Sequence, residues 1–316
     1  MTKVFIDGSA GTTGLRIFER LSARRDIELI KLPEALRKDA SARRDALNAA
    51  DIAFLCLPDA AAVEAVALIE NPDTAVIDTS TAHRTAAGWA YGMPELHGQR
   101  ARIAGSKRIA NPGCHASGFI ALIAPLVAAG IVGKDELLGC FSLTGYSGGG
   151  KKMIAEYESA DRSPLLKAPR QYGLSQQHKH LREMGAVCGL THLPGFSPIV
   201  ADFYSGMEVS VQLFNRDVNE IKSAYKALYR GPVIKYADEA NVACEASVAC
   251  EAGFLSAAAY SGRDDMEITV HGSDERVLLT ARFDNLGKGA SGAAIQNMNI
   301  LMGVDETEGL IIGSDE

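Results

Sequence analysis

From residue 3 to residue 109, short apolar runs alternate with longer segments in which apolar residues recur at helical spacing. Within residues 12–24, Leu15, Phe18 and Leu21 recur every three residues, which predicts a helix with one apolar face. Such alternation is typical of a parallel β-sheet with crossover helices, so the sequence predicts an α/β domain here. The predicted strands are residues 4–6, 27–32, 52–57, 75–77 and 108–110.

After about residue 130 the pattern changes. Apolar and polar residues alternate over longer spans, which suits an antiparallel sheet with one covered face. With 316 residues, 47% of them apolar, the chain is long enough to bury two cores, so we expect two domains. The strands predicted in this part are residues 138–143, 207–214, 266–270 and 277–283, and a last helix is predicted at residues 290–301.

The composition excludes several classes of protein. The net charge is −7 and charged residues are scattered, so we expect neither nucleic acid nor a membrane as a partner. No long apolar window occurs and the N-terminus runs directly into a strand, so we expect a cytoplasmic protein. The cysteines never form a CxxC pair, which indicates neither a disulfide framework nor a metal site. They are Cys56, Cys114, Cys140, Cys188, Cys244 and Cys250.

A glycine-rich turn joins the first predicted strand to the first predicted helix. In that position glycines let the backbone close on a pyrophosphate at a helix N-terminus. The spacing is GxxGxxG where the usual fingerprint is GxGxxG, so an ordinary glycine-rich turn is the alternative. The residues predicted to bind a dinucleotide cofactor here are Gly8, Ser9, Gly11, Thr12, Thr13 and Gly14.

The segment after the second predicted strand bears on which nicotinamide cofactor is used. An acid at the end of this strand would accept the ribose hydroxyls of NAD, whereas a base would accept the 2′-phosphate of NADP. No acid ends the strand, and Arg37 and Lys38 follow it. We therefore predict NADP, with Arg37 and Lys38 as cofactor-binding residues; the alternative is that the two form a solvated charge pair.

Cys114 lies where the strand at residues 108–110 gives way to an apolar helix, directly after Asn111, Pro112 and Gly113. It is thus placed at a helix N-terminus. Backbone N–H groups and the helix dipole stabilise a thiolate there, whereas an ordinary thiol with a pKa of about 8.5 is only a few per cent ionised at neutral pH. The sequence therefore predicts Cys114 as a nucleophile.

A thiolate that attacks a carbonyl also needs oxyanion donors and a place for the leaving group. The first-turn N–H groups of the Cys114 helix suit the oxyanion. The glycine-rich segment at residues 144–152 offers backbone N–H groups and two lysines, which suits a phosphate; a flexible turn is the alternative. The predicted phosphate-binding residues are Ser147, Gly148, Gly149 and Lys151.

A proton donor is also required, and His178 and His180 stand out in the polar segment at residues 177–183. Acid–base help from such a residue is worth roughly 10²–10⁴-fold in rate. Two histidines two residues apart do not share a helical face, so at most one faces Cys114 if this segment is helical. We predict both as catalytic candidates; a surface feature or a weak metal site is the alternative.

Seven landmarks of the chain occur in the order of one family. In residues and order, the chain resembles N-acetyl-gamma-glutamyl-phosphate reductase in its shorter, type 2 form. The resemblance implies a Rossmann NADP-binding domain at residues 1–113 and 285–316, and an α+β domain of the glyceraldehyde-phosphate dehydrogenase-like kind at residues 114–284. It also implies that Asn285 and Lys288 bind the cofactor. The landmarks are residues 8–14, 55–59, 78–84, 111–114, 145–151, 178–180 and 284–294.

The resemblance also implies an activity. The family reduces N-acetyl-L-glutamyl 5-phosphate to N-acetyl-L-glutamate 5-semialdehyde with NADPH in arginine biosynthesis, releases inorganic phosphate, and forms homo-oligomers, which we expect here as a dimer or tetramer. Its nucleophile corresponds to Cys114 and its histidine to His178 or His180. The chain departs from the family at His115 and Arg182. Aspartate-semialdehyde dehydrogenase and a non-catalytic NADP-binding regulator are the alternatives.

Overall fold

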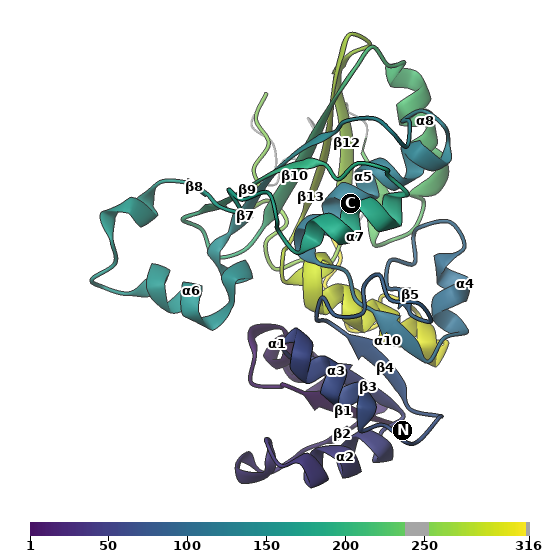
Figure 1. Cartoon of the computed structure of the whole chain (residues 1–316), viewed down its shortest axis with the longest axis vertical. Coiled ribbons are helices and arrows are strands. Elements are labelled where there is room, and N and C mark those ends of the chain that lie inside the picture. Colours follow the sequence, from purple (N-terminus) through teal and green to yellow (C-terminus); the bar gives the residue numbers. More distant parts are fainter. Residues whose placement is uncertain (238–252, 314–316) are drawn as a thin grey trace. The chain divides into compact units, whose positions relative to one another are not determined.

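The computed structural model describes residues 1–237 and 253–313 (Figure 1). Cys244 and Cys250 therefore lie outside the described residues. The chain divides into two compact units. The first unit comprises Met1–Pro112 and Ala290–Leu310, and the second comprises Gly113–Gly289 and the tail from Ile311.

The first unit is built on a six-stranded sheet in which every pair of neighbouring strands is parallel. This confirms the parallel sheet predicted for this part of the chain. The strand order reverses beside β1, because β2 follows β1 on one side and β3 pairs with it on the other. In sheet order the strands are β2 (Ile27–Ile30), β1 (Thr2–Asp7), β3 (Ile52–Leu55), β4 (Ala75–Asp78), β6 (Arg108–Ala110) and β5 (Ala90–Tyr91).

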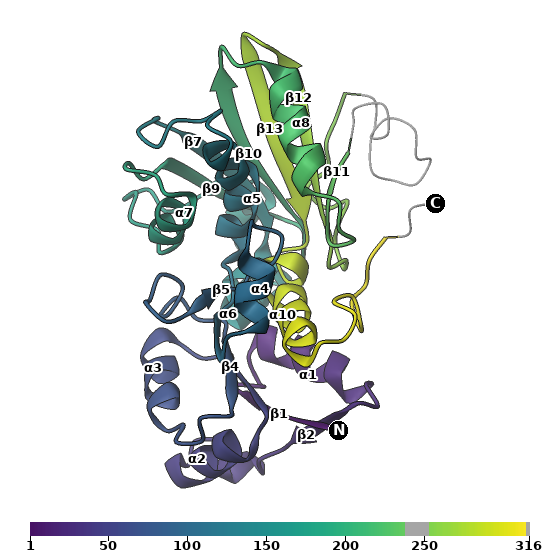
Figure 2. The same ribbon diagram turned by 90° about the vertical axis from the view of Figure 1, so that its right-hand side faces the viewer.

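Helices cover both faces of this sheet because its strands are apolar on both sides (Figure 2). Alternate residues of β1 point to opposite faces: Val4 belongs to one buried cluster with Ile17 of α1, and Phe5 belongs to another with Leu47 of α2. The helices of the unit are α1 (Thr12–Ser22), α2 (Ala40–Ala49), α3 (Asp59–Ala67), α4 (Gln99–Ala104) and α10 (Gly292–Met302), with a short 3₁₀ turn at Glu34–Leu36.

Helix α10 comes from the far end of the chain and completes the first core. Ile295 and Met298 pack in the same buried cluster as Val4. A buried guanidinium adds a polar tie, since Arg24 Nη1 donates to Asn299 Oδ1 at 2.5 Å. The apolar stripe of the last helix was visible in the sequence, whereas its return to the first domain was implied by the family resemblance and not by the periodicity.

The second unit contains a seven-stranded mixed sheet. The four strands predicted in this part pair antiparallel with one another, as expected, and the strands that were not predicted, β9 and β11, add parallel pairs. Strand β7 pairs with β9 in parallel, as does β11 with β12. The long connection between β7 and β9, which includes two helices, permits this parallel pairing, whereas a short hairpin would not. In sheet order the strands are β11 (Ile234–Tyr236), β12 (Met266–Ser273), β13 (Arg276–Phe283), β10 (Met207–Phe214), β7 (Gly139–Gly145), β9 (Gly195–Ala201) and β8 (Arg170–Gln171).

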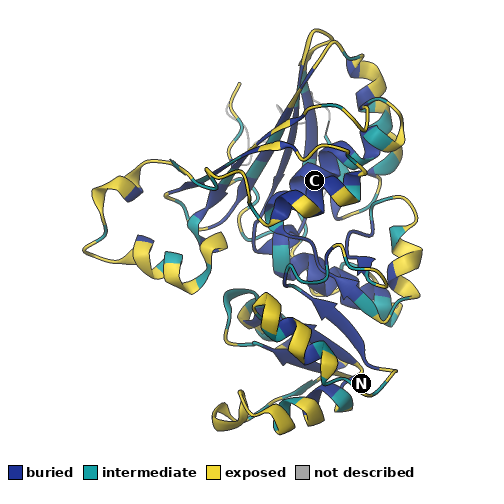
Figure 3. Ribbon diagram, viewed as in Figure 1, coloured by how far each residue is buried: buried dark blue, intermediate teal, exposed yellow. Residues whose placement is uncertain are grey.

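Helix α5 (Cys114–Ala128) is the most buried helix of the second unit, as its dark colour in Figure 3 shows. It runs on through Pro125, which has no N–H to donate to the carbonyl of Ala121. The Tyr229 hydroxyl donates to that carbonyl instead, at 2.6 Å. Among the described residues of this unit, the other helices are α6 (Gly150–Glu158), α7 (His180–Cys188) and α8 (Val218–Leu228), with 3₁₀ turns at Tyr146–Gly149 and Pro164–Lys167. A π-helical turn at Gly287–Ser291 precedes α10.

Among residues 1–237 and 253–313, no helix is both long and apolar enough to cross a membrane.

Candidate active site

Cys114 is the first residue of α5, as the sequence predicted. Gly113 precedes it in an extended conformation and no side chain caps the helix. The Gly113 N–H donates to Glu183 Oε1 at 2.8 Å, and Glu183 itself is buried in α7. Because Cys114 begins α5, it lies at the positive end of the helix dipole.

Gly289 lies directly against Cys114. A Cβ atom added to Gly289 would stand 2.9 Å from the Cβ of Cys114, closer than real Cβ atoms come to a neighbour. The Gly289 N–H donates to the carbonyl of Asp284 at 3.0 Å, which holds the turn in place. The segment after β13 therefore borders the candidate nucleophile within the second unit, and a side chain at position 289 would press on it.

Three histidine rings gather beside the start of α5. His115 is buried, and its ring centroid lies 5.7 Å from that of His178 and 5.6 Å from that of His180. Its Nδ1 is 2.7 Å from Ser142 Oγ and its Nε2 is 2.6 Å from the Tyr172 hydroxyl. Burial, assisted by the charge of His178, lowers the pKa of His115 to about 3. His115 is therefore neutral near pH 7 and holds its neighbours by hydrogen bonds.

Tyr172 connects this cluster with the thiol. Burial, and then the negative charge of Cys114, raises the pKa of its phenol. The phenol thus keeps its proton and remains a hydrogen-bond donor in the neighbourhood of Cys114.

The segment with His178 and His180 is not one continuous helix, so the restriction to one histidine does not apply. Helix α7 begins at His180, and His178 precedes it. The backbone N–H of His180 donates to His178 Nδ1 at 3.3 Å, and the two rings meet edge to face with centroids 4.7 Å apart. Because the chain turns at Lys179 rather than continuing a helix, both rings reach the same cluster.

The glycine-rich segment after β7 contains regular secondary structure. It forms a 3₁₀ turn and then the first residues of α6, where Lys151 is exposed. Ser147 is buried, whereas Gly148 and Gly149 are exposed. The Ser147 hydroxyl accepts from the side-chain amide of Asn285 at 3.0 Å, and Asn285 also accepts from the N–H of Gly206 at 3.0 Å. Asn285 thus braces this segment.

Lys288, which was predicted with Asn285 to bind the cofactor, is buried. A lysine ammonium is seldom buried without a partner, so we expect polar groups around the Lys288 side chain that stabilise its charge.

The remaining described cysteines differ from Cys114 in their surroundings. Burial raises the pKa of the Cys56 thiol to about 12 and raises the pKa of Cys140 and Cys188 as well. These thiols are poor nucleophiles near neutral pH because the thiolate is the reactive form.

In the first unit, the turn of Gly8 to Gly14 joins β1 to α1 as predicted. Gly8 has φ +87°, and a Cβ there would stand 2.2 Å from the carbonyl oxygen of Cys56. A Cβ at Gly14 would stand 2.4 Å from the carbonyl oxygen of Gly8. Thr12 and Thr13 open α1, and Gly11 precedes them without a side-chain cap. The turn is therefore tight, and the N-terminus of α1 that follows it is suited to bind an anionic group.

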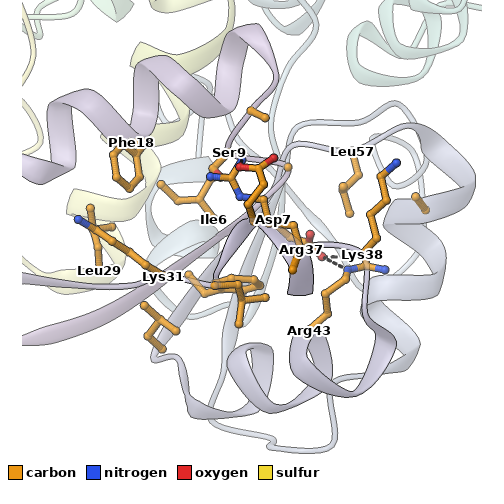
Figure 4. Close-up of a pocket in the computed structure, with 18 residues that line it drawn as sticks. Ile6, Asp7, Ser9, Phe18, Leu29, Lys31, Arg37, Lys38, Arg43 and Leu57 are labelled. Carbon is orange, nitrogen blue, oxygen red and sulfur yellow. Dashed lines mark hydrogen bonds and ion pairs between the residues drawn. The ribbon is translucent and has the colours of Figure 1, made fainter.

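A cavity of about 600 Å³ lies beside this turn, within the first unit (Figure 4). Arg37 and Lys38 line it, together with Ser9. Arg37 is half exposed and pairs with the exposed Glu34 at 2.9 Å. Such a surface pair is weak, so Arg37 can exchange this partner for a ligand phosphate.

A further base, Arg43 of α2, also lines the cavity, and it was not predicted from the sequence. Its guanidinium donates to Asp7 Oδ2 through Nε at 3.0 Å and Nη2 at 2.8 Å, as Figure 4 shows. Both side chains are largely buried. The sequence carried no signal for this pair, since thirty-six positions separate its members.

No cluster of three or more histidine, cysteine or acidic side chains able to hold a metal ion occurs in the described part of the chain.

Comparison with known proteins identifies both halves of the chain. Residues 3–104 match the family model described as semialdehyde dehydrogenase, NAD binding domain, and residues 114–285 match semialdehyde dehydrogenase, dimerisation domain. The first unit thus contains an NAD(P)-binding domain.

Two curated relatives match over nearly their whole length. N-acetyl-gamma-glutamyl-phosphate reductase 2 of Nostoc sp. is 43% identical, covering 98% of this chain and 99% of the relative. The protein of the same name from Pseudomonas putida is 44% identical, covering 97% and 98%.

Solved structures share the fold at low identity. Aspartate semialdehyde dehydrogenase II from Vibrio cholerae has a TM-score of 0.67 at 16% identity, covering 96% of this chain and 98% of that one. The Candida albicans aspartate semialdehyde dehydrogenase with NADP has a TM-score of 0.65 at 15% identity, covering 96% and 99%. The predicted fold class, a Rossmann domain with a semialdehyde dehydrogenase-type α+β domain, is confirmed.

Proposed function

Because the chain belongs to the N-acetyl-gamma-glutamyl-phosphate reductase family, we propose that it reduces N-acetyl-L-glutamyl 5-phosphate to N-acetyl-L-glutamate 5-semialdehyde with NADPH. The reaction is a step of arginine biosynthesis, and we assign it to the cytoplasm. The observation that carries this proposal is the position of Cys114 at the start of α5, beside the cluster of His115, His178 and His180. This arrangement suits nucleophilic attack followed by proton transfer.

The boundaries we propose for the cofactor domain are residues 1–113 and 285–316, and those of the substrate domain are residues 114–284. The match to a dimerisation domain supports a homo-oligomer, which we propose to be a dimer or tetramer. Light scattering coupled to gel filtration measures its mass, and a monomer at micromolar concentration would contradict the assembly.

The first unit fits a dinucleotide. The tight turn at Gly8 and Gly14 and the N-terminus of α1 suit the pyrophosphate, with Ser9, Gly11, Thr12 and Thr13 contributing. The cavity beside the turn suits the adenosine half, and its bases suit the 2′-phosphate of NADP. These bases are Arg37, Lys38 and Arg43. When bound, NADPH supplies the hydride for the reduction.

Cys114 performs the first covalent step. Its thiolate attacks the acyl carbon, the carbon–oxygen bond to phosphate breaks, and a thioester remains on Cys114. The first N–H groups of α5 stabilise the oxyanion that forms on the way. The departing phosphate takes up the proton that the overall reaction consumes, and Ser147, Gly148, Gly149 and Lys151 are the proposed residues around it.

The histidines serve the second step. His178 or His180, when protonated, donates to the oxygen of the thioester carbon as that carbon is reduced. The same imidazole recovers the proton when the carbon–sulfur bond breaks, which releases the aldehyde and regenerates the thiolate. His115 does not take this role, because its pKa is lowered to about 3.

The reverse reaction tests the proposal. N-acetyl-L-glutamate 5-semialdehyde, NADP and inorganic phosphate should together give NADPH absorbance, and omission of phosphate should abolish it. Cys114→Ser should lower this rate by at least about 1,000-fold while leaving NADPH affinity unchanged, because only the nucleophile is altered. A higher rate with aspartate semialdehyde would instead assign the other semialdehyde dehydrogenase activity, and NADPH binding without turnover of either aldehyde would indicate a regulator.

A further inference from the structure

Asp78 and His83 form a hydrogen-bonded dyad in the first unit that the reaction above does not use. Asp78 is the last residue of β4 and is fully buried. Its Oδ2 is 2.6 Å from His83 Nδ1. The same carboxylate accepts from the N–H of Ser80 at 2.9 Å and from its hydroxyl at 2.7 Å. The carboxylate is therefore an acceptor in all three bonds.

This arrangement fixes the state of the His83 ring. Because Asp78 accepts, the proton between the two lies on Nδ1, and in the neutral ring Nε2 is then an acceptor. The ring stacks on Trp89 with centroids 4.1 Å apart and planes 14° apart, which fixes its orientation. Within residues 1–237 and 253–313, no hydrogen bond engages Nε2, whereas Nδ1 is engaged.

The loop that carries His83 is pinned at several points. Asp59, at the start of α3, accepts from the N–H of Thr81 at 2.8 Å. Arg84 donates to the carbonyl of Asn111 at 3.0 Å and to that of Thr79 at 3.1 Å. A side chain on such a loop loses little freedom when it binds a ligand, which favours a binding role.

The strand register places the dyad at the cofactor edge of the sheet. Asp7 pairs with Leu55, and Leu55 pairs with Asp78, so the three stand in one row at the carboxyl ends of β1, β3 and β4. Asp78 is thus about 10 Å along the sheet from Asp7, at roughly 4.8 Å per strand. Dinucleotides bind across the point where the strand order reverses, which is here between β1 and β3.

The cavity with Arg37 and Arg43 lies on the side of β1 and β2, so the adenosine half of the cofactor belongs there. The other half must then extend over β3 and β4. We propose that His83 Nε2 accepts a hydrogen bond from the nicotinamide riboside half of NADP(H), and that Asp78 is the positioning residue that holds the ring. This inference rests on the proposed cofactor but not on the proposed acyl substrate.

Two substitutions separate a binding role from a structural one. In His83→Asn the side-chain amide can still donate to Asp78, but no atom replaces the acceptor Nε2. In His83→Gln the longer side chain places an acceptor near the position of Nε2, but the hydrogen bond to Asp78 is lost. Calorimetric titration with NADPH and with adenosine 2′,5′-bisphosphate, which lacks the nicotinamide half, gives the dissociation constants. Trp89 is the only tryptophan of the chain, so its fluorescence reports on the same place.

We expect His83→Asn to weaken NADPH binding roughly five- to tenfold, the value of one hydrogen bond, and to leave the bisphosphate affinity unchanged. His83→Gln should retain more of the NADPH affinity than His83→Asn. The reverse order, or equal loss for both ligands, would assign the dyad to holding the loop and would overturn the proposal. If the unaltered protein binds neither ligand, the cofactor assignment itself fails, and the dyad proposal fails with it.

Discussion

The two units build their polar sites by different means. In the first, full charges meet at strand ends: Arg43 pairs with Asp7 at 2.8 Å, beside a cavity lined by further bases. In the second, His115 is held between the hydroxyls of Ser142 and Tyr172, and its pKa is lowered to about 3.

The difference fits the roles that we propose, which are phosphate recognition at the first site and proton transfer at the second. A phosphate carries permanent charge, so permanent cations recognise it, and the Asp7 carboxylate orients one of them. In the histidine cluster, the charge of His178 contributes to the lowered pKa of His115, so a proton on one ring disfavours a proton on the next. The first site is therefore organised around fixed charges, and the second around one transferable proton.

The largest expected effect concerns thiol reactivity. A thiol with a pKa of about 12, as at Cys56, is ionised to about one part in 10,000 at pH 8, against roughly a quarter for an ordinary thiol. Iodoacetamide should therefore label Cys114 at least about 1,000-fold faster than Cys56. Cys140 and Cys188 should be similarly slow, because burial also raises their pKa.

Peptide mapping by mass spectrometry after timed labelling reads each cysteine separately, including Cys244 and Cys250. Labelling of Cys56 at a rate comparable with Cys114 would remove the contrast between the proposed nucleophile and the buried thiols. Labelled protein should lose activity in proportion to modification of Cys114 alone.

The second-largest expected effect tests whether the Arg43 charge in the first unit determines the preference for NADPH. Arg43→Ala removes a largely buried guanidinium from the cavity wall. A hydrogen bond to a charged group contributes about 1.5–3 kcal/mol, so we expect the preference for NADPH over NADH to fall roughly 10- to 100-fold. The ratio of kcat/KM for the two cofactors measures it.

Arg37→Ala is the matched control. Arg37 lines the same cavity but is half exposed and paired with Glu34, so its removal should change the preference less than that of Arg43. A larger effect at Arg37 than at Arg43 would mean that the base predicted from the sequence, and not the one held by Asp7, recognises the 2′-phosphate.

The neutral state of His115 predicts how stability depends on pH. Its pKa is lowered in the folded protein, so between the two pKa values the unfolded chain binds a proton at His115 and the folded chain does not. The stabilisation is complete above the ordinary pKa and is lost as the pH falls toward 3. Between pH 7 and pH 5 this one group should cost about 2 kcal/mol of the free energy of unfolding.

His115→Asn removes the titration, so urea denaturation at the two pH values should show a loss smaller by that amount. His192→Asn, at an exposed position of the same unit, is the control for the substitution itself. An unchanged slope in His115→Asn would contradict the neutral, buried imidazole.

The fold could be predicted wherever periodicity specifies the structure. Strand β10 and the strand β6 before Cys114 lie where the apolar pattern put them, and Cys114 begins its helix. Strand pairing is different. Nothing in the alternation of β7 or β9 encodes which neighbour each takes, so the parallel pairs of the second sheet could not be predicted.

The site was predictable where chemistry lies close in the chain. Three glycines in a short segment predict the turn after β1. The hydrogen-bond partners of the site residues, in contrast, lie far away in the sequence: Arg43 bonds Asp7, and Tyr172 and Ser142 bond His115. Asp78 and His83 are only five residues apart, yet they meet through a loop with no periodic pattern. Periodicity reports which face is buried, not which polar groups meet.

The smallest expected effect concerns the hydrogen bond from Tyr229 to the backbone of α5, the helix that begins at Cys114. Pro125 leaves the Ala121 carbonyl without a helical donor, and the Tyr229 hydroxyl donates to it at 2.6 Å. Tyr229→Phe should therefore lower the free energy of unfolding by about 1–2 kcal/mol, since a buried acceptor loses its donor. In a Pro125→Ala background the new N–H can serve Ala121, so the same substitution should cost less. A double-mutant cycle measures this coupling, and equal costs in both backgrounds would show that Tyr229 stabilises α5 by packing and not by replacing the hydrogen bond that proline removes.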